Sequence, residues 1–416
     1  MKLVIIAGGK GTRISSISKQ VPKSMIEING KPIIEYQIEL AKKYNLTDII
    51  ITIGYLGDVI KNYFKNGKKW GVNITYYEES TPLGTAGAFV EISDFLKEDF
   101  IVFYGDTIMD IDLNKMIFFH KKLKSDATLF LHPNDHPFDS DLVKMGKNNK
   151  ILQFLSKPHP ENLVYKNLVN AALYILNPKV ISLIPKNIKS DFGKDIFPSC
   201  IKNSLNIYGY TSPEYIKDMG TPKRFNKVTK DLISGKVAKL NLKNKRPCIF
   251  LDRDGVICEE VDLLHKPNQL KLIDGIVDAL KYIKNKGYLA VIVTNQPVVA
   301  RNLCSIKELE YIHMKLETLL GNKGAYLDAI YFCPHHPDSG FPEENRKYKI
   351  LCECRKPKAG MFFTAQKELN IDLQNSFMIG DRASDIEAGN LAGLKKSYLI
   401  KRNKPNSLNK LIKEII

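Results

Sequence analysis

Short apolar stretches alternate with longer stretches of helical period along the chain. Runs rich in β-branched residues at 3–7, 49–53 and 101–104 are separated by segments whose apolar positions recur every three to four residues, as at 33–44 and 59–64. Fully apolar strands joined by amphipathic helices are typical of a parallel sheet that is covered by helices. The pattern therefore predicts an α/β domain in the first half of the chain.

A second series of the same kind begins near residue 248. Strands are expected at 248–251, 289–293 and 377–379, with helical segments between them. Between the two series, the Lys- and Asn-rich stretch 238–247 has no periodicity and ends in a proline, as is typical of a linker. A chain of 416 residues with 44% hydrophobic residues also exceeds what one core usually organises. We therefore predict two Rossmann-like α/β domains, residues 1–237 and 248–416, joined by a linker at 238–247.

The chain is basic, with 62 Lys and Arg against 45 Asp and Glu and a formal net charge of +17. These cations are scattered among Asn and Ile without a basic block or a nucleic-acid module, so we expect no nucleic-acid partner and no membrane partner. No apolar run approaches the roughly 20 residues of a membrane-spanning helix, and 3–7 is too short for a signal peptide. We expect a cytoplasmic protein whose seven cysteines are not paired in disulfides.

Polar side chains stand at the ends of the three strands of the second series. Because the carboxyl ends of parallel strands meet at one edge of a sheet, we expect these side chains to gather there. Carboxylates brought together repel one another unless a cation lies among them, and a few carboxylates plus a phosphate are the usual magnesium arrangement. The alternative, that each Asp only caps the next helix, fits one position better than the whole set. The residues are Asp252, Asp254, Thr294, Asn295, Asp381 and Asp385.

Cysteines and histidines cluster between the second and third of these strands. Cys333 and His335 are followed, after sixteen residues, by Cys352 and Cys354. Three thiolates and one imidazole form an ordinary tetrahedral zinc set with no open position, so we expect a structural ion rather than a catalytic one. His336 is an alternative imidazole ligand, and four unliganded side chains are the alternative without a metal.

A glycine-rich segment opens the first domain. The strand expected at 3–7 runs into Gly8-Gly9-Lys10-Gly11-Thr12-Arg13, where glycines allow main-chain N–H groups to approach phosphate oxygens closely. The segment lacks the Gly-Lys-Ser/Thr end of a Walker loop, and no acidic residue follows at the distance that a dinucleotide-binding fold requires. It therefore indicates a phosphate-binding loop of another kind.

The C-terminal motifs resemble those of the haloacid dehalogenase superfamily over about residues 247–400. The resemblance rests on Asp252-Arg253-Asp254-Gly255, Thr294-Asn295-Gln296, Arg355-Lys356-Pro357 and Gly380-Asp381-Arg382-Ala383-Ser384-Asp385. Within the superfamily, the sequence is similar to the subgroup that contains histidinol phosphatase and heptose bisphosphate phosphatase, and this subgroup carries a zinc loop of the same kind.

The resemblance implies covalent catalysis at the first motif. Asp252 would attack phosphorus, and Asp254 would protonate the leaving oxygen and then activate water, so that one hard displacement becomes two easier ones. Asp252, Asp381 and the main chain of Asp254 would hold magnesium.

It also implies how the phosphate is bound. Thr294 and Lys356 would hold the phosphoryl oxygens, and Asn295 and Arg355 are assigned to the sugar phosphate. Because Cys354 immediately precedes Arg355, the zinc would anchor the loop that presents these cations.

The first domain resembles sugar-phosphate nucleotidylyltransferases over nearly all of residues 1–230. The resemblance rests on the glycine segment together with Pro22-Lys23, Leu83-Gly84-Thr85-Ala86-Gly87-Ala88, Tyr104-Gly105-Asp106, Lys157-Pro158 and Asp218-Met219-Gly220-Thr221-Pro222. The chain departs from the family pattern at Ser24, Ser156 and Asn170-Ala171-Ala172. These departures bear on substrate detail more than on the reaction class.

Positioned cations would supply most of the catalysis in such an enzyme, because charge builds on the transferring group and on departing pyrophosphate. The resemblance implies that Arg13 and Lys23 are these cations and that Asp106 and Asp218 hold magnesium. The nucleotide would contact Gly8, Gly9, Gly11, Thr12, Gly84, Thr85 and Gly87, and the sugar phosphate would contact Lys157 and Asn170.

Two such activities on one chain fit together if the product of one is the substrate of the other. Heptose 1,7-bisphosphate would lose its distal phosphate, and the resulting heptose 1-phosphate would receive a nucleotidyl group from a nucleoside triphosphate. The segment Gly30 to Tyr36 and the context of Gly84 look most like heptose 1-phosphate guanylyltransferases, which favours GTP.

Two alternatives stay open. One is a nucleotidylyltransferase of mannose or glucose type joined to a phosphatase of unrelated small esters such as histidinol phosphate. The other is a nucleic-acid or membrane-surface binding protein with decayed catalytic folds. Such decay would remove catalytic carboxylates, but the chain retains Asp106, Asp218, Asp252, Asp254 and Asp381. The sequence does not predict the oligomeric state.

Overall fold

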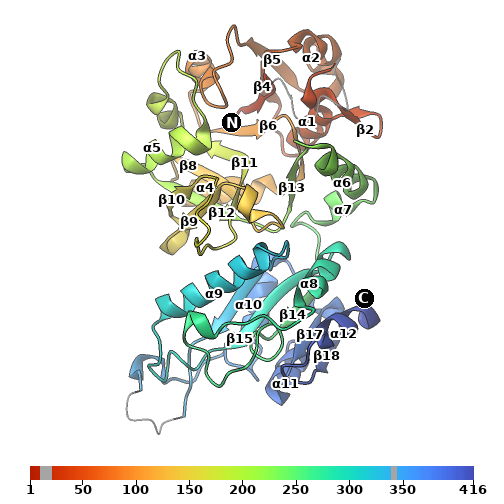
Figure 1. Cartoon of the computed structure of the whole chain (residues 1–416). Helices are drawn as coiled ribbons and strands as arrows, with labels where there is room; N and C mark the ends of the chain where they lie inside the picture. The colour runs from red at the N-terminus through yellow and green to blue at the C-terminus, as the bar shows by residue number, and fades with distance from the viewer. Residues whose placement is uncertain (10–20, 339–343) are drawn as a thin grey trace. The chain divides into compact units, whose positions relative to one another are not determined.

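The computed structural model describes residues 1–9, 21–338 and 344–416 (Figure 1). The chain forms two compact units. Unit 1 comprises Met1–His132, Asp141–Lys157 and Val169–Asn241, and unit 2 comprises Pro133–Ser140, Pro158–Leu168 and Leu242–Ile416. The boundary at Asn241 lies inside the stretch expected as a linker, whereas the assignment of 133–140 and 158–168 to unit 2 differs from the expected domain 1–237.

Within the described residues, unit 1 is built on a nine-stranded mixed sheet. Strand β1 (Leu3–Ile6) pairs in parallel with β4 (Asp48–Ile53) and β6 (Phe100–Tyr104), and β4 pairs in parallel with β5 (Asn73–Glu78). The other side of the sheet is mostly antiparallel. It contains β8 (Ala127–His132), β9 (Leu142–Met145), β10 (Ile151–Leu155), β11 (Val169–Leu176) and β12 (Ile207–Thr211). A separate ribbon pairs β7 (Thr107–Asp110) with β13 (Tyr215–Asp218).

Helix α1 (Ile33–Lys43) shows how the sequence pattern becomes packing in unit 1. The helix follows Pro32, carries an acidic residue in its first turn and two lysines in its last, and so complements its own dipole. Ile34, Ile38 and Ala41, at helical spacing, are buried in the core with β1 and β4. The remaining helices are α2 (Gly57–Phe64), α3 (Ala88–Glu91), α4 (Leu113–Lys122), α5 (Phe197–Lys202), α6 (Pro222–Ile233) and α7 (Lys236–Lys239).

Unit 2 is built on a five-stranded parallel sheet in the order β16-β15-β14-β17-β18 among its described residues. Every residue of the central strand β14 is buried, because helices cover both faces of the sheet. The strands are β14 (Cys248–Leu251), β15 (Leu289–Asn295), β16 (Ala329–Cys333), β17 (Phe377–Gly380) and β18 (Lys396–Leu399).

Alternate residues of β14 enter different cores. Ile249 and Leu251 pack with α8 (Ile276–Asn285), α9 (Ile306–Gly321) and α12 (Ser407–Ile415), whereas Cys248 and Phe250 pack with α10 (Gly360–Leu369) and α11 (Ala383–Leu391). The Phe250 and Phe362 rings lie 4.8 Å apart between their centroids. This three-layer arrangement confirms the expected α/β fold and leaves the carboxyl ends of the strands open for chemistry.

The segments Pro133–Ser140 and Pro158–Leu168 belong to unit 2 through contacts with α9. The backbone N–H of Tyr165 donates to Thr318 Oγ1 at 3.0 Å, and the Thr318 hydroxyl donates to the Tyr165 carbonyl at 3.1 Å. The Tyr165 hydroxyl donates to Asn322 Oδ1 at 3.1 Å. Unit 2 is therefore assembled from three stretches of the sequence. In the described parts of the chain, no helix has the length and apolar character needed to cross a membrane.

Candidate functional sites

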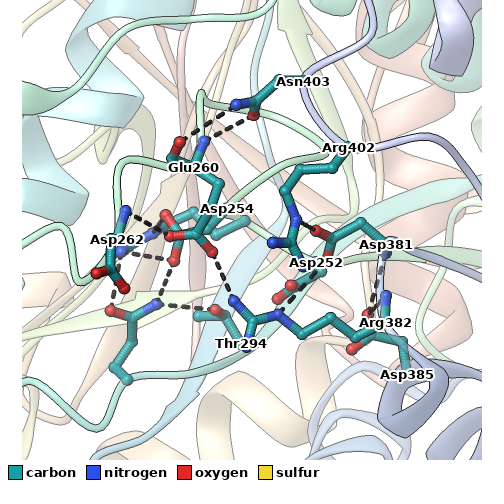
Figure 2. Close-up of polar contacts among 12 residues, drawn as sticks. Asp252, Asp254, Glu260, Asp262, Thr294, Asp381, Arg382, Asp385, Arg402 and Asn403 are labelled. Atoms are coloured by element: carbon teal, nitrogen blue, oxygen red, sulfur yellow. Dashed lines mark hydrogen bonds and ion pairs between the residues drawn. The ribbon is translucent and has the colours of Figure 1, made fainter.

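The carboxyl edge of the unit 2 sheet gathers the side chains expected there (Figure 2). Asp252 immediately follows β14, Thr294 lies near the end of β15, and Asp381 immediately follows β17. Asp252 and Thr294 are buried, with 7% and 1% of their surface exposed. The site therefore consists of polar groups placed by three neighbouring strands at the point where the strand order reverses.

Lys356 is a buried cation among these carboxylates. Its Nζ lies 2.9 Å from Asp252 Oδ1 and 2.5 Å from Asp385 Oδ1, and it donates to the Val293 carbonyl at 2.8 Å. Burial raises the pKa of Asp252 to about 6, and the nearby Asp385 and Asp254 act in the same direction, while Lys356 opposes the shift. Lys356 thus partly neutralises a site that carries excess negative charge.

Three carboxylates meet the requirements of a magnesium site. One oxygen from each of Asp252, Asp381 and Asp385 lies within 4.8 Å of the others. Asp381 Oδ1 is buried and, within the described residues, has no hydrogen-bond partner, so an oxygen atom is available for a cation. Gly255 has φ +76°, and a Cβ there would lie 2.5 Å from Asp381 Oδ2, so glycine is needed beside this carboxylate. Oxygen donors of this kind suit a hard divalent ion.

Asp385 had been noted in the sequence only as part of the strand-end set, without a role. In the structure its Oδ2 accepts hydrogen bonds from the backbone N–H groups of Asp381 (3.1 Å) and Arg382 (3.0 Å), while its Oδ1 contacts Lys356. The signal for this role was its position in the first turn of α11, three residues after the N-cap Arg382, where a carboxylate can accept from backbone N–H groups.

Asp254 lies outside this group of three carboxylates and is held by other partners. Arg253 and Gln296, to which the sequence assigned no role, bind its carboxylate. Burial acts to raise the pKa of Asp254, but the ion pair with Arg253 and the hydrogen bonds outweigh burial and hold the pKa below its ordinary value. Two carboxylates one residue apart therefore have pKa values that are shifted in opposite directions.

The two half-exposed arginines at the rim of the site are also bound to carboxylates (Figure 2). Arg402 Nε lies 2.5 Å from Asp381 Oδ2, and Arg382 Nη2 lies 2.7 Å from Glu260 Oε2. Asn403 accepts a hydrogen bond from the Glu260 backbone N–H at 2.8 Å. These contacts join the loops after β14, β17 and β18.

The four zinc candidates come together as a compact group. The sulfur atoms of Cys333, Cys352 and Cys354 lie 3.2 to 3.6 Å apart, and His335 Nδ1 lies 3.6 and 3.4 Å from the sulfurs of Cys333 and Cys354. Zinc bonds of about 2.0 to 2.3 Å place tetrahedral ligands about 3.5 Å apart, so the donor set fits a zinc ion. His336 is outside the group.

The zinc candidates are connected to the two cations that are expected to bind phosphate, Arg355 and Lys356. Arg355 Nη1 donates to the His335 carbonyl at 3.0 Å, so this side chain is bound to the cysteine loop. Asn295 and Lys356 form a reciprocal pair, in which Asn295 Nδ2 donates to the Lys356 carbonyl (2.9 Å) and the Lys356 N–H donates to Asn295 Oδ1 (3.0 Å). Asn295 and Arg355 therefore position the segment that carries Lys356.

In unit 1, Lys23 forms an ion pair with Asp106, which lies in the turn between β6 and β7. Gln37 fixes this turn, because its Nε2 donates to the carbonyls of Tyr104 and Thr107, each at 2.8 Å. Two residues expected to handle the triphosphate are thus in contact at the carboxyl end of β6.

Asp218 lies close to the same turn. It is opposite Thr107 in the β7–β13 ribbon, and the N–H of the next residue, Met219, donates to the Asp106 carbonyl at 3.0 Å. Arg224 Nη1 donates to both oxygens of Asp218, at 3.0 and 2.8 Å. Burial acts to raise the pKa of Asp218, but Arg224 and the Gly220 N–H outweigh it and lower the pKa. Arg224 had no assigned role in the sequence.

The segment Gly84 to Gly87 is fixed against residues 190–192. Gly84 has φ +84°, and a Cβ there would lie 2.4 Å from the Ser190 carbonyl oxygen, so only glycine fits. The Thr85 hydroxyl donates to Asp191 Oδ2 at 2.9 Å and accepts from the Phe192 N–H at 3.0 Å. These bonds occupy the Thr85 side chain and hold the backbone of the segment in place.

Lys157 and Asn170 are brought together by Asp141. The Lys157 N–H donates to Asp141 Oδ1 at 3.3 Å, and the Asn170 N–H donates to the Asp141 carbonyl at 3.0 Å. Gly8 and Gly9 follow β1, and the carboxylate of Glu79, whose pKa is raised by burial, lies against Gly8. Gly11, Thr12 and Arg13 lie outside the described residues.

Comparisons with known proteins divide the chain in the same way. A family model described as nucleotidyl transferase matches residues 2–235, and one described as HAD-hydrolase-like matches residues 353–407. The D-glycero-beta-D-manno-heptose-1,7-bisphosphate 7-phosphatase of Photorhabdus laumondii is 40% identical over 159 residues, which are 38% of this chain and 82% of that protein. Its counterpart in Pasteurella multocida is 42% identical over 160 residues, 38% of this chain and 84% of that protein.

Other similarities extend across the first unit. A UTP–glucose-1-phosphate uridylyltransferase from Synechocystis is 29% identical over 256 residues, 58% of this chain and 66% of that protein. Among solved structures, a candidate glucose-1-phosphate thymidylyltransferase from Bacillus anthracis, in complex with sucrose, aligns with a TM-score of 0.50 and 25% identity. This alignment covers 55% of our chain and 94% of that one.

Proposed function

Because the chain belongs to the nucleotidyl transferase family over residues 2–235 and carries a haloacid dehalogenase-like phosphatase domain behind it, we propose that it makes a nucleotide-activated heptose in two steps. Unit 2 removes the 7-phosphate of heptose 1,7-bisphosphate. Unit 1 then joins the heptose 1-phosphate to a nucleotide and releases pyrophosphate. The observation that carries this proposal is that phosphatases named for this bisphosphate match unit 2 over more than four-fifths of their own length.

The geometry of unit 2 supports phosphoryl transfer to Asp252. An oxygen of Asp252 bonds to phosphorus as the bond from phosphorus to O7 of the sugar breaks, and the sugar oxygen takes a proton from Asp254. Lys356 and Thr294 bind the phosphoryl oxygens. Gln296 Nε2 donates to Thr294 Oγ1 at 2.9 Å, so the hydroxyl proton of Thr294 remains available for the substrate.

The second step returns Asp252 to its free state. A water molecule loses a proton to Asp254 and attacks phosphorus, and the bond from phosphorus to Asp252 breaks. The low pKa of Asp254 describes the protein without substrate, and a phosphate dianion bound beside it raises this pKa toward the protonated form that the first step needs. Asp252, Asp381 and the main chain of Asp254 would hold magnesium, which would supply positive charge against the phosphoryl oxygens.

In unit 1, the 1-phosphate of the sugar attacks the α-phosphorus of the nucleoside triphosphate, and the bond to pyrophosphate breaks. Lys23 stabilises the charge that builds on the transferring group, and Asp106 and Asp218 would hold magnesium. We assign Lys157 and Asn170 to the sugar phosphate because Asp141 holds the two residues together. Arg13 and the glycine segment are proposed to bind the triphosphate on the sequence resemblance alone.

We propose GTP as the nucleotide, from the sequence resemblance of Gly30 to Tyr36, and zinc as a structural ion in unit 2. We also propose a cytoplasmic location, where nucleoside triphosphates are found and where the seven cysteines, none of them in a disulfide within the described residues, stay reduced. A glucose- or mannose-type nucleotidyl transferase is the second candidate, because the similar proteins named above act on glucose 1-phosphate according to their names.

The test is to incubate the purified chain with heptose 1,7-bisphosphate, magnesium and equimolar GTP, ATP, UTP, CTP and dTTP, and to identify the products by mass spectrometry. We expect GDP-heptose as the sole sugar nucleotide. A different heptose nucleotide would overturn the choice of GTP and leave the two steps in place. Bisphosphate that stays intact, together with conversion of glucose or mannose 1-phosphate in a parallel reaction with the same nucleotides, would establish the second candidate instead.

A further inference from the structure

The carboxylate of Asp254 accepts four hydrogen bonds inside unit 2. Oδ1 accepts from Arg253 Nε at 2.9 Å and from the Cys258 thiol at 3.3 Å. Oδ2 accepts from Arg253 Nη2 at 2.9 Å and from Gln296 Nε2 at 2.8 Å. A carboxylate offers about four lone-pair positions, and the thiol is the weakest of the four donors, so its bond is the one that gives way when Asp254 takes up a proton. The orientation of Asp254 is therefore set by its neighbours and not by solvent.

Arg253 is the principal donor and is entirely buried, with 0% of its surface exposed. Its Nε and Nη2 each bind one oxygen of Asp254, and Nη1 and Nη2 make further hydrogen bonds to protein groups. Nη2 also donates to Gln296 Oε1 at 2.8 Å, and Nη1 donates to His313 Nε2 at 3.1 Å. A planar two-bond pairing fixes the direction of a carboxylate more strictly than a single bond does.

Gln296 connects this arrangement to the phosphoryl site. Its amide nitrogen donates to Asp254 Oδ2 and to Thr294 Oγ1, while its amide oxygen accepts from Arg253. The side chain that binds a phosphoryl oxygen and the one that moves the proton are thus held by one amide. His313, on α9, accepts a hydrogen bond from Arg253 Nη1, the guanidinium nitrogen that does not contact Asp254.

We propose that Arg253 is a positioning residue for the phosphatase reaction, which aims the carboxylate of Asp254 at the leaving oxygen of the substrate. The inference rests on the proposed phosphatase function. Arg253 would then affect one step of the reaction. In that step Asp254 gives a proton to the sugar oxygen as the bond between this oxygen and phosphorus breaks. In the alternative, purely structural role, Arg253 would stabilise the fold and have no specific effect on the proton transfer.

These two roles differ in their dependence on the leaving group. A sugar alkoxide is a poor leaving group and needs a proton, whereas 4-nitrophenolate is a good one and does not. The ratio kcat/KM covers the steps up to phosphorylation of Asp252 and so reports this proton transfer. Misdirecting Asp254 therefore reduces kcat/KM selectively for the sugar phosphate, whereas a damaged fold reduces it for both substrates.

The experiment compares Arg253→Met and Arg253→Lys with the unaltered full chain, on heptose 1,7-bisphosphate and on 4-nitrophenyl phosphate. For Arg253→Met we expect kcat/KM to fall by about 100-fold or more on the bisphosphate, a typical contribution of acid–base catalysis, and by less than about 10-fold on the aryl ester. Arg253→Lys keeps the positive charge but cannot bind both carboxylate oxygens through a guanidinium. We therefore expect kcat/KM on the bisphosphate to fall, but by less than in Arg253→Met. If Arg253→Met does not fold, Gln296→Leu is the second variant, with the same substrate dependence expected.

Arg246→Met is the matched control, since Arg246 is also buried in unit 2, with 2% of its surface exposed, but precedes β14. We expect this change to affect both substrates equally. Nucleotidylyl transfer by each variant, measured on supplied sugar 1-phosphate, reports on the rest of the chain. Equal losses on both substrates for Arg253→Met would overturn the inference. If the unaltered chain hydrolyses the aryl ester but not the bisphosphate, the proposed substrate is refuted. The Arg253 variants would then be compared on the sugar phosphate that the unaltered chain does hydrolyse.

Discussion

Two buried cations give the neighbouring carboxylates of unit 2 different properties. Lys356 lies between Asp252 and Asp385, and Arg253 binds Asp254. Burial raises the pKa of Asp252 to about 6, whereas Arg253 holds the pKa of Asp254 low against the effect of burial. Asp252 must be ionised to attack and Asp254 protonated to act as an acid, so a cation beside Asp252 and a phosphate beside Asp254 would have to reverse both shifts.

The buried His313 makes the free energy of unfolding of unit 2 depend on pH. Burial and the neighbouring Arg253 lower its pKa to about 3 from the ordinary value of 6.5. The unfolded chain therefore takes up a proton below pH 6.5 that the folded chain does not take up until about pH 3. The free energy of unfolding must decrease as the pH falls through this window, by about 1.4 kcal/mol per pH unit from this group.

We expect His313→Gln, which keeps an acceptor for Arg253, to remove this contribution. The measurement is the urea midpoint of unit 2 at pH 7 and pH 5 for both chains. The drop between the two pH values should be smaller in the variant, and equal drops would show that His313 is protonated in the folded protein.

Asp106 provides a prediction for unit 1. Asp106→Asn removes the charge that pairs with Lys23 and the proposed magnesium ligand. We expect kcat for nucleotidylyl transfer to fall by about 100-fold or more, because electrostatic stabilisation is usually the largest part of such catalysis. Pyrophosphate release from GTP and heptose 1-phosphate measures this. Asp94→Asn, at an exposed pair with Lys97, is the control and should leave the rate unchanged.

At the scale of elements, the loops after the strands carry most of the chemistry. The group of Cys333, His335, Cys352 and Cys354 connects the end of β16 to the segment before α10, and Arg355 donates to the His335 carbonyl. A metal at this position would fix the backbone that leads directly to Lys356. Lys356, which we propose binds phosphate, thus lies in a segment that this loop holds on one side and Asn295 on the other.

Removing one zinc ligand tests this arrangement. We expect Cys354→Ser to lower the zinc content from one ion per chain toward zero and to reduce phosphatase kcat/KM by at least about 10-fold, an effect typical of disturbed metal surroundings. Nucleotidylyl transfer should not change. Cys304→Ser, a buried thiol outside the group, should retain the zinc. Full phosphatase activity in a zinc-free variant would contradict a role of the loop in positioning Lys356.

At the scale of the molecule, unit 2 requires segments from the first half of the sequence. Thr318 on α9 exchanges two hydrogen bonds with the backbone of Tyr165. A fragment of residues 242–416 lacks Pro133–Ser140 and Pro158–Leu168, and so leaves these groups on α9 without their partners. We expect this fragment to be less stable than unit 2 in the full chain.

Thermal unfolding followed by loss of phosphatase activity compares the fragment with the full chain. In the full chain, Thr318→Val should reduce stability by about 1–2 kcal/mol, because the buried polar groups of Tyr165 lose their partner. A fragment as stable as the full chain would place the domain boundary where the sequence alone puts it, at 238–247.

We expect the two proposed sites to work independently of one another. We expect Asp252→Asn to lower phosphatase turnover by at least about 1000-fold, because an amide oxygen is a poor nucleophile, while transfer to supplied heptose 1-phosphate continues at the normal rate. The bisphosphate alone should then yield no sugar nucleotide. A loss of both activities in a folded protein would refute the two-site proposal.

The sequence by itself determined the fold class and the strands that carry the site. The strands expected at 248–251, 289–293 and 377–379 occur as β14, β15 and β17, since buried parallel strands are continuous apolar runs. The spacing of Cys333, His335, Cys352 and Cys354 likewise predicted a compact group, because pairs of ligands two residues apart lie close together wherever the chain brings the pairs into contact.

Only the tertiary structure decided which charges pair and which segments complete a unit. Arg224 on Asp218, Arg253 on Asp254, and Lys356 between Asp252 and Asp385 are choices among many Lys and Arg residues with similar local sequence. The assignment of 158–168 to unit 2 also depends on contacts with α9, about 150 residues away in the sequence. The pairing of Lys356 with Asp252 and the contact of Tyr165 with Thr318 depend on the packing of elements far apart in the sequence. Arg253 adjoins Asp254 and Arg224 lies six residues from Asp218, so for these two pairs the sequence brings the partners near and only the fold decides which way each side chain turns.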